Sequence, residues 1–186
     1  MTDQKIKGSI LKSRLEFVRK EIGDDGLATL VESLPEDDQK ALGRLVTVAW
    51  VDFEVGKRLD DAIVQALGGG STRFFERLGE ESAEVNLGTL HSAFLAPGDP
   101  QGFLAKAPQI YRLYYDVGWR EYEQTGEREG VLTTHDAETF SKTDCLTVIG
   151  WYRKALELCG AKNVQIQEDE CRATGGSVCK YRVTWQ

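Results

Sequence analysis

The sequence predicts an α+β fold in which a helical N-terminal part packs on an antiparallel sheet. Apolar residues recur at helical spacing through most of the first two thirds of the chain, alternating runs follow from about residue 119, and one helical run interrupts them. At 186 residues with 41% hydrophobic content, the chain suits a single domain over residues 1–186. We expect the helical part at about 11–118 and the sheet part at about 119–186.

The N-terminal part begins with a β-like run at Ile6–Ile10, followed by a succession of amphipathic helices. Asp24 or Asp25 caps the second helix, the glycines at 68–70 end the fourth, and Ser71 caps the fifth. The apolar residues that mark these helices are Leu11, Leu15, Val18 and Ile22; Leu27, Leu30, Val31 and Leu34; Leu42, Leu45 and Val46; Val55, Leu59, Ile63 and Leu67; Phe74, Phe75, Leu78, Val85, Leu90 and Phe94; and Phe103, Leu104, Ile110, Leu113 and Val117.

The C-terminal part alternates strands with one helix. Strands are predicted near Trp119–Gln124 and Val131–Thr134, and a helix over Phe140–Cys159 that Gly160 ends. A strand at Asn163–Gln167 follows the helix. Residues 174–177 then form the turn of a hairpin whose second strand is Val178–Trp185.

Four residues in this part form a ligand set for a soft divalent metal: Cys145, Glu168, Cys171 and Cys179. From Cys145 the helix runs roughly 21 Å to Cys159, and the strand after it returns roughly the same distance. Glu168 and Cys171 therefore come back beside Cys145, and the hairpin places Cys179 opposite Cys171. Because thiolates are soft ligands and four protein groups leave no open position, we expect a structural zinc site.

Two alternatives stay open at this site. Glu168 and Cys171 face opposite sides of a regular strand, so the chain must bend between them, and Glu170 is the second candidate for the carboxylate ligand. The cysteines are otherwise ordinary thiols, with Cys171 and Cys179 able to form a disulfide under oxidation. Cys159 lies outside the set and is expected to be buried at the helix end.

Composition excludes several classes of function. A formal net charge of -7 argues against nucleic acid or an anionic membrane as the main partner. No apolar run is long enough to span a bilayer, and the first residues lack the apolar core of a signal peptide, so we expect a cytoplasmic protein. No spacing specifies a nucleophile with its base, and no nicotinamide or flavin fingerprint is present, so we expect no enzymatic activity.

The last third of the chain resembles the vinyl-4-reductase domain, a small-molecule-binding module of bacterial aromatic-responsive regulators. The resemblance is carried by Gly150-Trp151 after the first cysteine, Gly160, the run Glu168-x-Glu170-Cys171-Arg172, and Gly175 before Cys179. In several of those relatives the matching cysteines and glutamate hold zinc. Over its whole length the chain resembles a paralogous family of myxobacterial proteins without assigned function. The architecture is similar to haem nitric oxide/oxygen-binding domains and to small subunits of vesicle-tethering complexes.

The resemblance also implies a ligand pocket between the helices and the sheet. In the aromatic-sensing relatives a histidine and a tryptophan bind the ligand's hydroxyl group, and His91 and Trp119 are the candidates here, with Tyr111 and Trp151 among the aromatic walls. Haem is expected to be absent. The Tyr-x-Ser-x-Arg motif of the haem sensors is missing, and the position of their axial histidine falls on Tyr111.

Two functions from different classes follow. The first is a small-molecule sensor or regulatory domain with a structural zinc site, binding a small hydrophobic or aromatic ligand and signalling through a partner protein. The alternative is a protein-interaction scaffold or adaptor with a filled core, as in the vesicle-tethering relatives. An apolar helix face left over in the monomer would permit a homodimer in either case.

Overall fold

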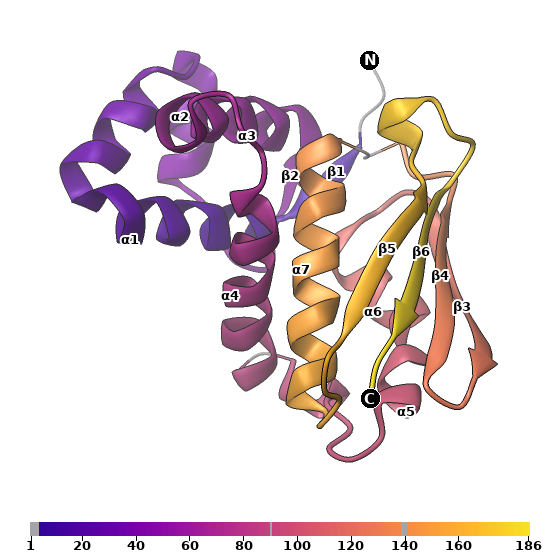
Figure 1. The fold of residues 1–186 in the computed structure, drawn as a ribbon. Helices are drawn as coiled ribbons and strands as arrows, with labels where there is room; N and C mark the ends of the chain where they lie inside the picture. The colour runs from indigo at the N-terminus through magenta and orange to yellow at the C-terminus, as the bar shows by residue number, and fades with distance from the viewer. Residues whose placement is uncertain (1–3, 90, 139–140) are drawn as a thin grey trace.

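The structure, a computed structural model, describes residues 4–89, 91–138 and 141–186. Helices fill the N-terminal part and an antiparallel sheet dominates the C-terminal part, so the predicted α+β class is confirmed (Figure 1). The helices are α1 (Gly8–Glu32), α2 (Glu36–Gly43), α3 (Phe53–Gly68), α4 (Phe74–Gly88), α5 (Pro100–Leu104), α6 (Ala107–Tyr114) and α7 (Lys142–Leu158), with 3-10 turns η1 (Ser92–Phe94) and η2 (Arg172–Thr174). Of the helices in these ranges, none is long and apolar enough to cross a membrane.

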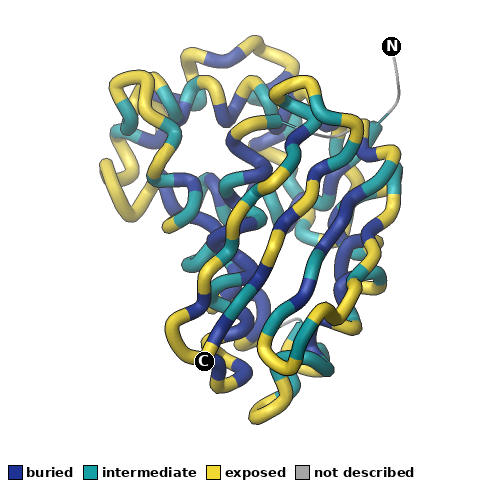
Figure 2. The backbone as a smooth tube through the Cα atoms, turned by 45° about the vertical axis from the view of Figure 1, so that its right-hand side comes forward, coloured by how far each residue is buried: buried dark blue, intermediate teal, exposed yellow. Residues whose placement is uncertain are grey.

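The main sheet contains β3 (Trp119–Gly126), β4 (Glu129–His135), β5 (Gln165–Glu170) and β6 (Cys179–Thr184) in the order β3-β4-β6-β5, with every neighbouring pair antiparallel. Along β6 the side chains alternate: Tyr181 and Val183 are buried, whereas Lys180 and Arg182 are exposed. One face of the sheet packs on α6 and α7 (Figure 1). Exposed residues recur along the strands on the other face (Figure 2).

A second, two-stranded sheet pairs β1 (Lys5–Lys7) with β2 (Trp50–Asp52). The strand predicted at Ile6–Ile10 is therefore present only in its first residues, because α1 already begins at Gly8. Strand β2 was not predicted from the sequence, because its three residues are too few for alternation to be recognised. The two helices predicted before Pro35 appear as one element that leaves helical geometry at Gly23, where φ is 75° and ψ is 178°.

Several predicted helix boundaries are corrected. The helix expected to continue to Phe94 ends at Gly88, and its predicted residue Leu90 lies outside the described residues. Its N-cap is Arg73, although the Ser71 hydroxyl accepts a hydrogen bond from the backbone N–H of that residue. The run expected from Phe103 to Val117 is divided into α5 and α6, because Pro108 in the first turn of α6 cannot donate a backbone hydrogen bond.

The predicted helix Phe140–Cys159 corresponds to α7. Phe140 lies outside the described residues, and Ser141 caps the helix by accepting a 3.1 Å hydrogen bond from the Asp144 N–H. The last helical residue is Leu158, with Cys159 as C-cap and Gly160 in the left-handed region at φ 97°. Glycine tolerates this conformation, so the predicted helix stop is confirmed.

Helix α4 belongs to both apolar clusters of the molecule. One cluster lies among α1, α2 and α3 and includes Phe75 and Leu78 from the first half of α4. The other lies between α6, α7 and the sheet and includes Ala83 and Leu87 from its second half. Displacing α4 would therefore disturb both clusters at once.

Helices α4 and α7 lie so close together that glycine is required at their contact (Figure 1). A Cβ atom on Gly79 would lie 2.1 Å from the Thr147 carbonyl oxygen, and one on Gly150 would lie 1.8 Å from the Glu76 carbonyl oxygen. Both obstacles are backbone atoms, which cannot rotate away as a flexible side chain can. The two glycines therefore set the distance between the helices.

We predict that Gly150→Ala lowers the free energy of unfolding by at least about 2 kcal/mol, because the added methyl group forces α7 away from α4. The measurement is urea denaturation followed by circular dichroism. Gly88→Ala is the matched control, since this helical glycine of α4 has no atom within 4 Å of its Cβ position. Equal stability of the two variants would contradict the close contact.

Candidate metal centre and interior cavity

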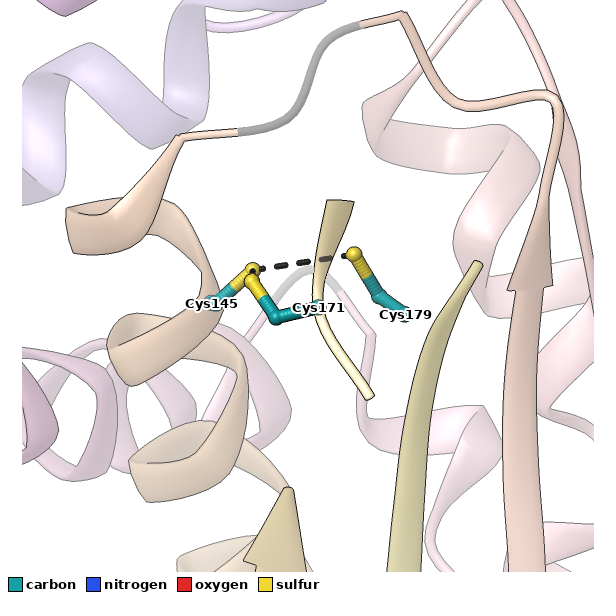
Figure 3. A group of neighbouring side chains, drawn as sticks. All are labelled: Cys145, Cys171 and Cys179. Carbon is teal, nitrogen blue, oxygen red and sulfur yellow. Dashed lines mark hydrogen bonds between the residues drawn. The ribbon is translucent and has the colours of Figure 1, made fainter. Parts of the chain in front are cut away.

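Three buried thiols come together at the top of the sheet. Cys145 lies in the first turns of α7, Cys171 follows β5, and Cys179 begins β6. The Sγ atom of Cys145 lies 3.5 Å from that of Cys171 and 3.8 Å from that of Cys179, and all three sulfur atoms lie within 4.8 Å of one another (Figure 3). These distances suit a metal. Thiolates bound tetrahedrally at about 2.3 Å from one zinc ion are about 3.8 Å apart.

The local backbone explains this convergence. The register of β5 against β6 shifts between Glu168 and Glu170, which supplies the bend that the sequence analysis required. Cys171 then leaves the strand in an extended conformation, and Gly175 takes a left-handed one at φ 96°. The turn returns the chain so that Cys179 lies near Cys171.

The thiols differ in their tendency to ionise. The pKa of Cys179 is lowered to about 6 by a hydrogen bond from Cys145 and by a 3.5 Å hydrogen bond from the backbone N–H of Arg172. Burial alone would raise this pKa. The pKa of Cys145 is raised by its hydrogen bond to Cys179 and by burial, and that of Cys171 is raised by burial. One thiolate is thus already favoured near neutral pH, and a bound cation would favour the other two.

Glu168, the carboxylate predicted as the fourth ligand, is not part of the group of three thiols whose ligand atoms lie within 4.8 Å of one another. Its side chain is only 12% exposed, and its Oε2 atom accepts a 3.3 Å hydrogen bond from Lys142 Nζ. Its Oε1 atom is buried and has no hydrogen-bond partner among the described residues. The Glu168 carboxylate also raises the pKa of both Cys171 and Cys179, so its charge acts on the sulfur cluster. The unpartnered Oε1 atom leaves this carboxylate able to bind a cation, but the structure groups only the three thiols at metal-ligand distance.

Glu170, the alternative carboxylate, has another role. Its Oε1 atom accepts hydrogen bonds from the Ser177 N–H at 2.6 Å, the Ser177 hydroxyl at 2.9 Å and the Val178 N–H at 3.2 Å. These bonds lower the pKa of Glu170 and fix the turn before β6. Cys159, predicted to lie outside the ligand set, is buried at the opposite end of α7, where its carbonyl accepts a 2.8 Å hydrogen bond from Gly98.

A cavity of about 50 Å³ lies among α1, α4, α6, α7 and β3. This is room for about four water molecules. Its wall is aromatic, with polar groups from four elements. The lining residues include Tyr111, Tyr114, Tyr115, Trp151 and Tyr152, together with Arg14, Ser82, Arg120 and Asp144.

Only two of the four residues predicted to bind a ligand line the cavity. Tyr111 and Trp151 line the cavity, whereas His91 and Trp119 are not among its lining residues. Because α4 stops at Gly88, His91 is half-buried before η1, and its ring lies 5.6 Å from that of Tyr114. Burial lowers the pKa of His91. Trp119 is 42% exposed, and its ring stacks 4.1 Å from that of His135.

Strand alternation places Arg120, rather than Trp119, inside the molecule. The Arg120 side chain is buried, and its Nε donates a 2.8 Å hydrogen bond to the Thr134 hydroxyl. Its Cζ atom lies 5.1 Å from the ring of Tyr111, 5.4 Å from that of Tyr152 and 6.0 Å from that of Tyr181. The sequence analysis missed this residue, although the alternation around it was visible.

A buried ion network joins the helical part to α7. Arg14 binds Asp60 through both Nε and Nη2, the latter at 3.1 Å, and its Nη2 also lies 3.5 Å from Asp144. The Tyr115 hydroxyl donates to the Asp144 carboxylate at 2.7 Å, and the Thr143 hydroxyl donates to Asp60 at 2.8 Å. Burial raises the pKa of Asp144 against the opposing effect of Arg14. Arg14 follows Leu11 by one helical turn, so it shares the inward face of α1.

Comparisons with known proteins identify a family and a fold. The sequence pattern of the family described as protein of unknown function (DUF2378) matches residues 70–186, more than half of the chain. No curated protein sequence matches the chain.

Solved structures of H-NOX proteins are similar over nearly the whole chain. An H-NOX protein from S. oneidensis in the Fe(II)NO state has a TM-score of 0.73 at 16% identity, with 97% of this chain and 99% of that chain covered. The Fe(II) unliganded H-NOX protein from K. algicida also has a TM-score of 0.73, at 12% identity, with 97% and 96% covered. An oxygen-binding H-NOX domain related to soluble guanylate cyclases has a TM-score of 0.71 at 13% identity, with 97% and 95% covered. At such identities the likeness shows the fold alone.

We predict that Arg14→Met lowers the free energy of unfolding by about 3–5 kcal/mol, because it leaves the buried Asp60 and Asp144 carboxylates without their cation. Thermal and urea unfolding measure this loss. Arg19→Met, on the same helix, removes an exposed arginine paired with Glu16 and Asp24 and should change stability by less than about 1 kcal/mol. Similar losses in both variants would contradict the central role of the buried network.

Proposed function

The chain belongs to the DUF2378 family of proteins of unknown function, and we propose that it is a non-enzymatic small-molecule sensor domain with a structural zinc site. One observation carries this proposal: a cavity lined by aromatic rings and buried charged groups lies in the interior, close to a cluster of three thiols. The H-NOX proteins of similar fold are described as binding NO or oxygen. A ligand in the interior of this fold therefore has a precedent, although fold alone assigns no function.

Zinc is the proposed metal because the three clustered thiols are soft donors. Cys145, Cys171 and Cys179 would bind it as thiolates, and the unsatisfied Oε1 atom of Glu168 would be the fourth ligand. With four protein ligands no position remains for substrate, so the role is structural. The ion would tie the N-terminal turn of α7 to the β5–β6 hairpin.

Haem does not fit the interior side chains, and we propose that this chain functions without it. The cavity measures about 50 Å³, and no histidine is among its lining residues. The Tyr111 hydroxyl, at the position that resemblance assigns to the axial ligand, already donates a 2.8 Å hydrogen bond to the Val117 carbonyl. His135, the second histidine, binds Glu121 near the start of β3.

Signalling would proceed through a partner protein, because the proposed sensor has no catalytic output of its own. A cytoplasmic location suits this proposal, since a reducing compartment keeps the four cysteines available as thiols. Ligand binding would change the surface presented by the helices around the cavity.

A scaffold for protein interactions is the second candidate. It is favoured by the exposed apolar side chains of the segment before β2, where Val46 is 55% and Val48 70% exposed, with Trp50 beside them. In this candidate the interior cavity has no ligand. A small organic molecule that co-purifies with the protein, detected by native mass spectrometry, would distinguish the sensor from the scaffold.

We predict one zinc per chain by elemental analysis of protein purified without chelators. Cys171→Ser and Cys179→Ser should abolish this zinc and lower Tm by roughly 6–12 °C, the shift expected for about 3 kcal/mol in a chain of this size. Both variants should also expose the β5–β6 hairpin to proteolysis. Cys159→Ser is the matched control and should retain zinc. Loss of zinc from all three variants, or its absence from the wild-type protein, would refute the assignment.

We predict that the purified protein, titrated with haem, shows no stoichiometric Soret band, because the interior offers neither space nor an axial histidine. Absorption spectroscopy of the wild-type protein and of His91→Ala measures this, and the two should give the same weak, unsaturable signal. A saturable band in the wild-type protein that His91→Ala removes would make the chain a haem protein.

A further inference from the structure

Arg120 is a buried cation that forms no ion pair with a described carboxylate. Its side chain is 5% exposed. Arg120 lowers the pKa of Asp144 in the same cavity wall, but that carboxylate already accepts hydrogen bonds from Arg14 and Tyr115. A buried guanidinium group costs several kcal/mol unless it is paired, and contacts with aromatic rings recover about 2 kcal/mol.

Two hydroxyl groups beside the cavity lack an acceptor for their own protons. The Tyr114 hydroxyl is buried and has no hydrogen-bond partner among the described residues, and the buried Tyr152 hydroxyl accepts a hydrogen bond from Arg120 but has no acceptor itself. Both residues line the same cavity as Arg120. Burial raises the pKa of Tyr114, and the neighbouring Tyr152 raises it further, so the two hydroxyls interact. Unsatisfied donors of this kind indicate a missing acceptor.

Together these groups define the chemistry of the missing ligand. A guanidinium group presents two parallel N–H donors that match the two oxygens of a carboxylate. Two phenol hydroxyls add neutral donors to the same space. The ligand must therefore be an anion that accepts several hydrogen bonds.

The size of the cavity limits this anion. A cavity of roughly 150 Å³ holds benzene, and the present one, at about 50 Å³, has a third of that volume. Only a few non-hydrogen atoms fit. Aromatic acids are therefore excluded unless the wall moves.

We propose that the cavity binds a small planar oxyanion, of which acetate and formate are the representatives, paired with Arg120 and hydrogen-bonded by Tyr152 and Tyr114. The proposal rests on the sensor function and specifies its ligand class. The methyl group of acetate would lie against the rings of Tyr111 and Trp151 in the same wall.

The test is a thermal unfolding titration of the 186-residue, zinc-loaded protein with sodium acetate, formate and nitrate, each against sodium chloride at equal ionic strength. Acetate or formate should raise Tm saturably, by roughly 5–10 °C at a hundred times Kd. Nitrate has the same planar geometry, so a comparable shift with nitrate extends the site to oxyanions in general. A shift confined to acetate and formate restricts it to carboxylates.

Substitutions test the assigned groups. Tyr152→Phe and Tyr114→Phe remove hydroxyls whose protons lack an acceptor, so the free protein should keep its Tm or gain stability, while Kd for acetate rises at least about tenfold. Tyr122→Phe is the control: its hydroxyl binds Gln101 outside the cavity, so this variant should lose stability and keep its Kd. Arg120→Gln should abolish the shift, and the tyrosine variants decide the matter if Arg120→Gln does not fold.

Failure of this proposal can be separated from failure of the sensor function. If no oxyanion shifts Tm beyond chloride but neutral phenol does, the oxyanion proposal falls and the sensor function stands. If neither class shifts Tm and no organic mass co-purifies, both fall. A shift that survives unchanged in Tyr152→Phe and Tyr114→Phe would place the anion elsewhere and overturn the assignment.

Discussion

The contact between α4 and α7 is the constraint on which the other features of the structure depend. Gly79 and Gly150 allow the two backbones to touch, and any larger residue there would place its Cβ atom within about 2 Å of a carbonyl oxygen. The contact fixes α7 against the helix that belongs to both apolar clusters. Arg153 on α7 reinforces it through Glu76 and Glu80, at 2.8 Å each. Every side chain that the proposed function uses on α7 is positioned by this packing.

Successive residues at the start of α7 serve different sites. Asp144 enters the buried ion network beside the cavity, whereas Cys145 turns toward the thiols. Between them lies a smaller space of about 20 Å³, lined by Arg120, Tyr181 and Cys179 among others. The Tyr181 ring faces Arg120 on one side, and its hydroxyl donates to Cys145 on the other. Arg120 is therefore separated from the three thiols by Tyr181, so the proposed ligand and the proposed metal would be coupled through that side chain.

Sequence reasoning succeeded where one pattern was long or one spacing was strict. The apolar periodicity of α3 and α7 predicted both helices, and the distance from Cys145 to Gly160 and back predicted the approach of three cysteines. Sequence patterns did not predict features that depend on tertiary packing, namely where α4 ends and which side chain of β3 is buried. The end of α4 at Gly88 moved His91 off the helix, and no local signal marks that end apart from the glycine itself. Arg120 was missed because a charged residue on a strand is ordinarily assigned to the solvent face, and only the packed tyrosines reveal its burial.

This chain shares its backbone fold with H-NOX proteins but differs from them in most of its side chains. A TM-score of 0.73 at 16% identity means that the backbone arrangement persists while nearly all side chains change. The interior of such a fold is a space whose contents are set by its lining residues. In this chain Arg120 and several tyrosines line the interior cavity, together with Arg14 and Asp144, and no histidine is among its lining residues in the described part of the chain. The chemistry proposed for the site therefore follows from these side chains rather than from the fold.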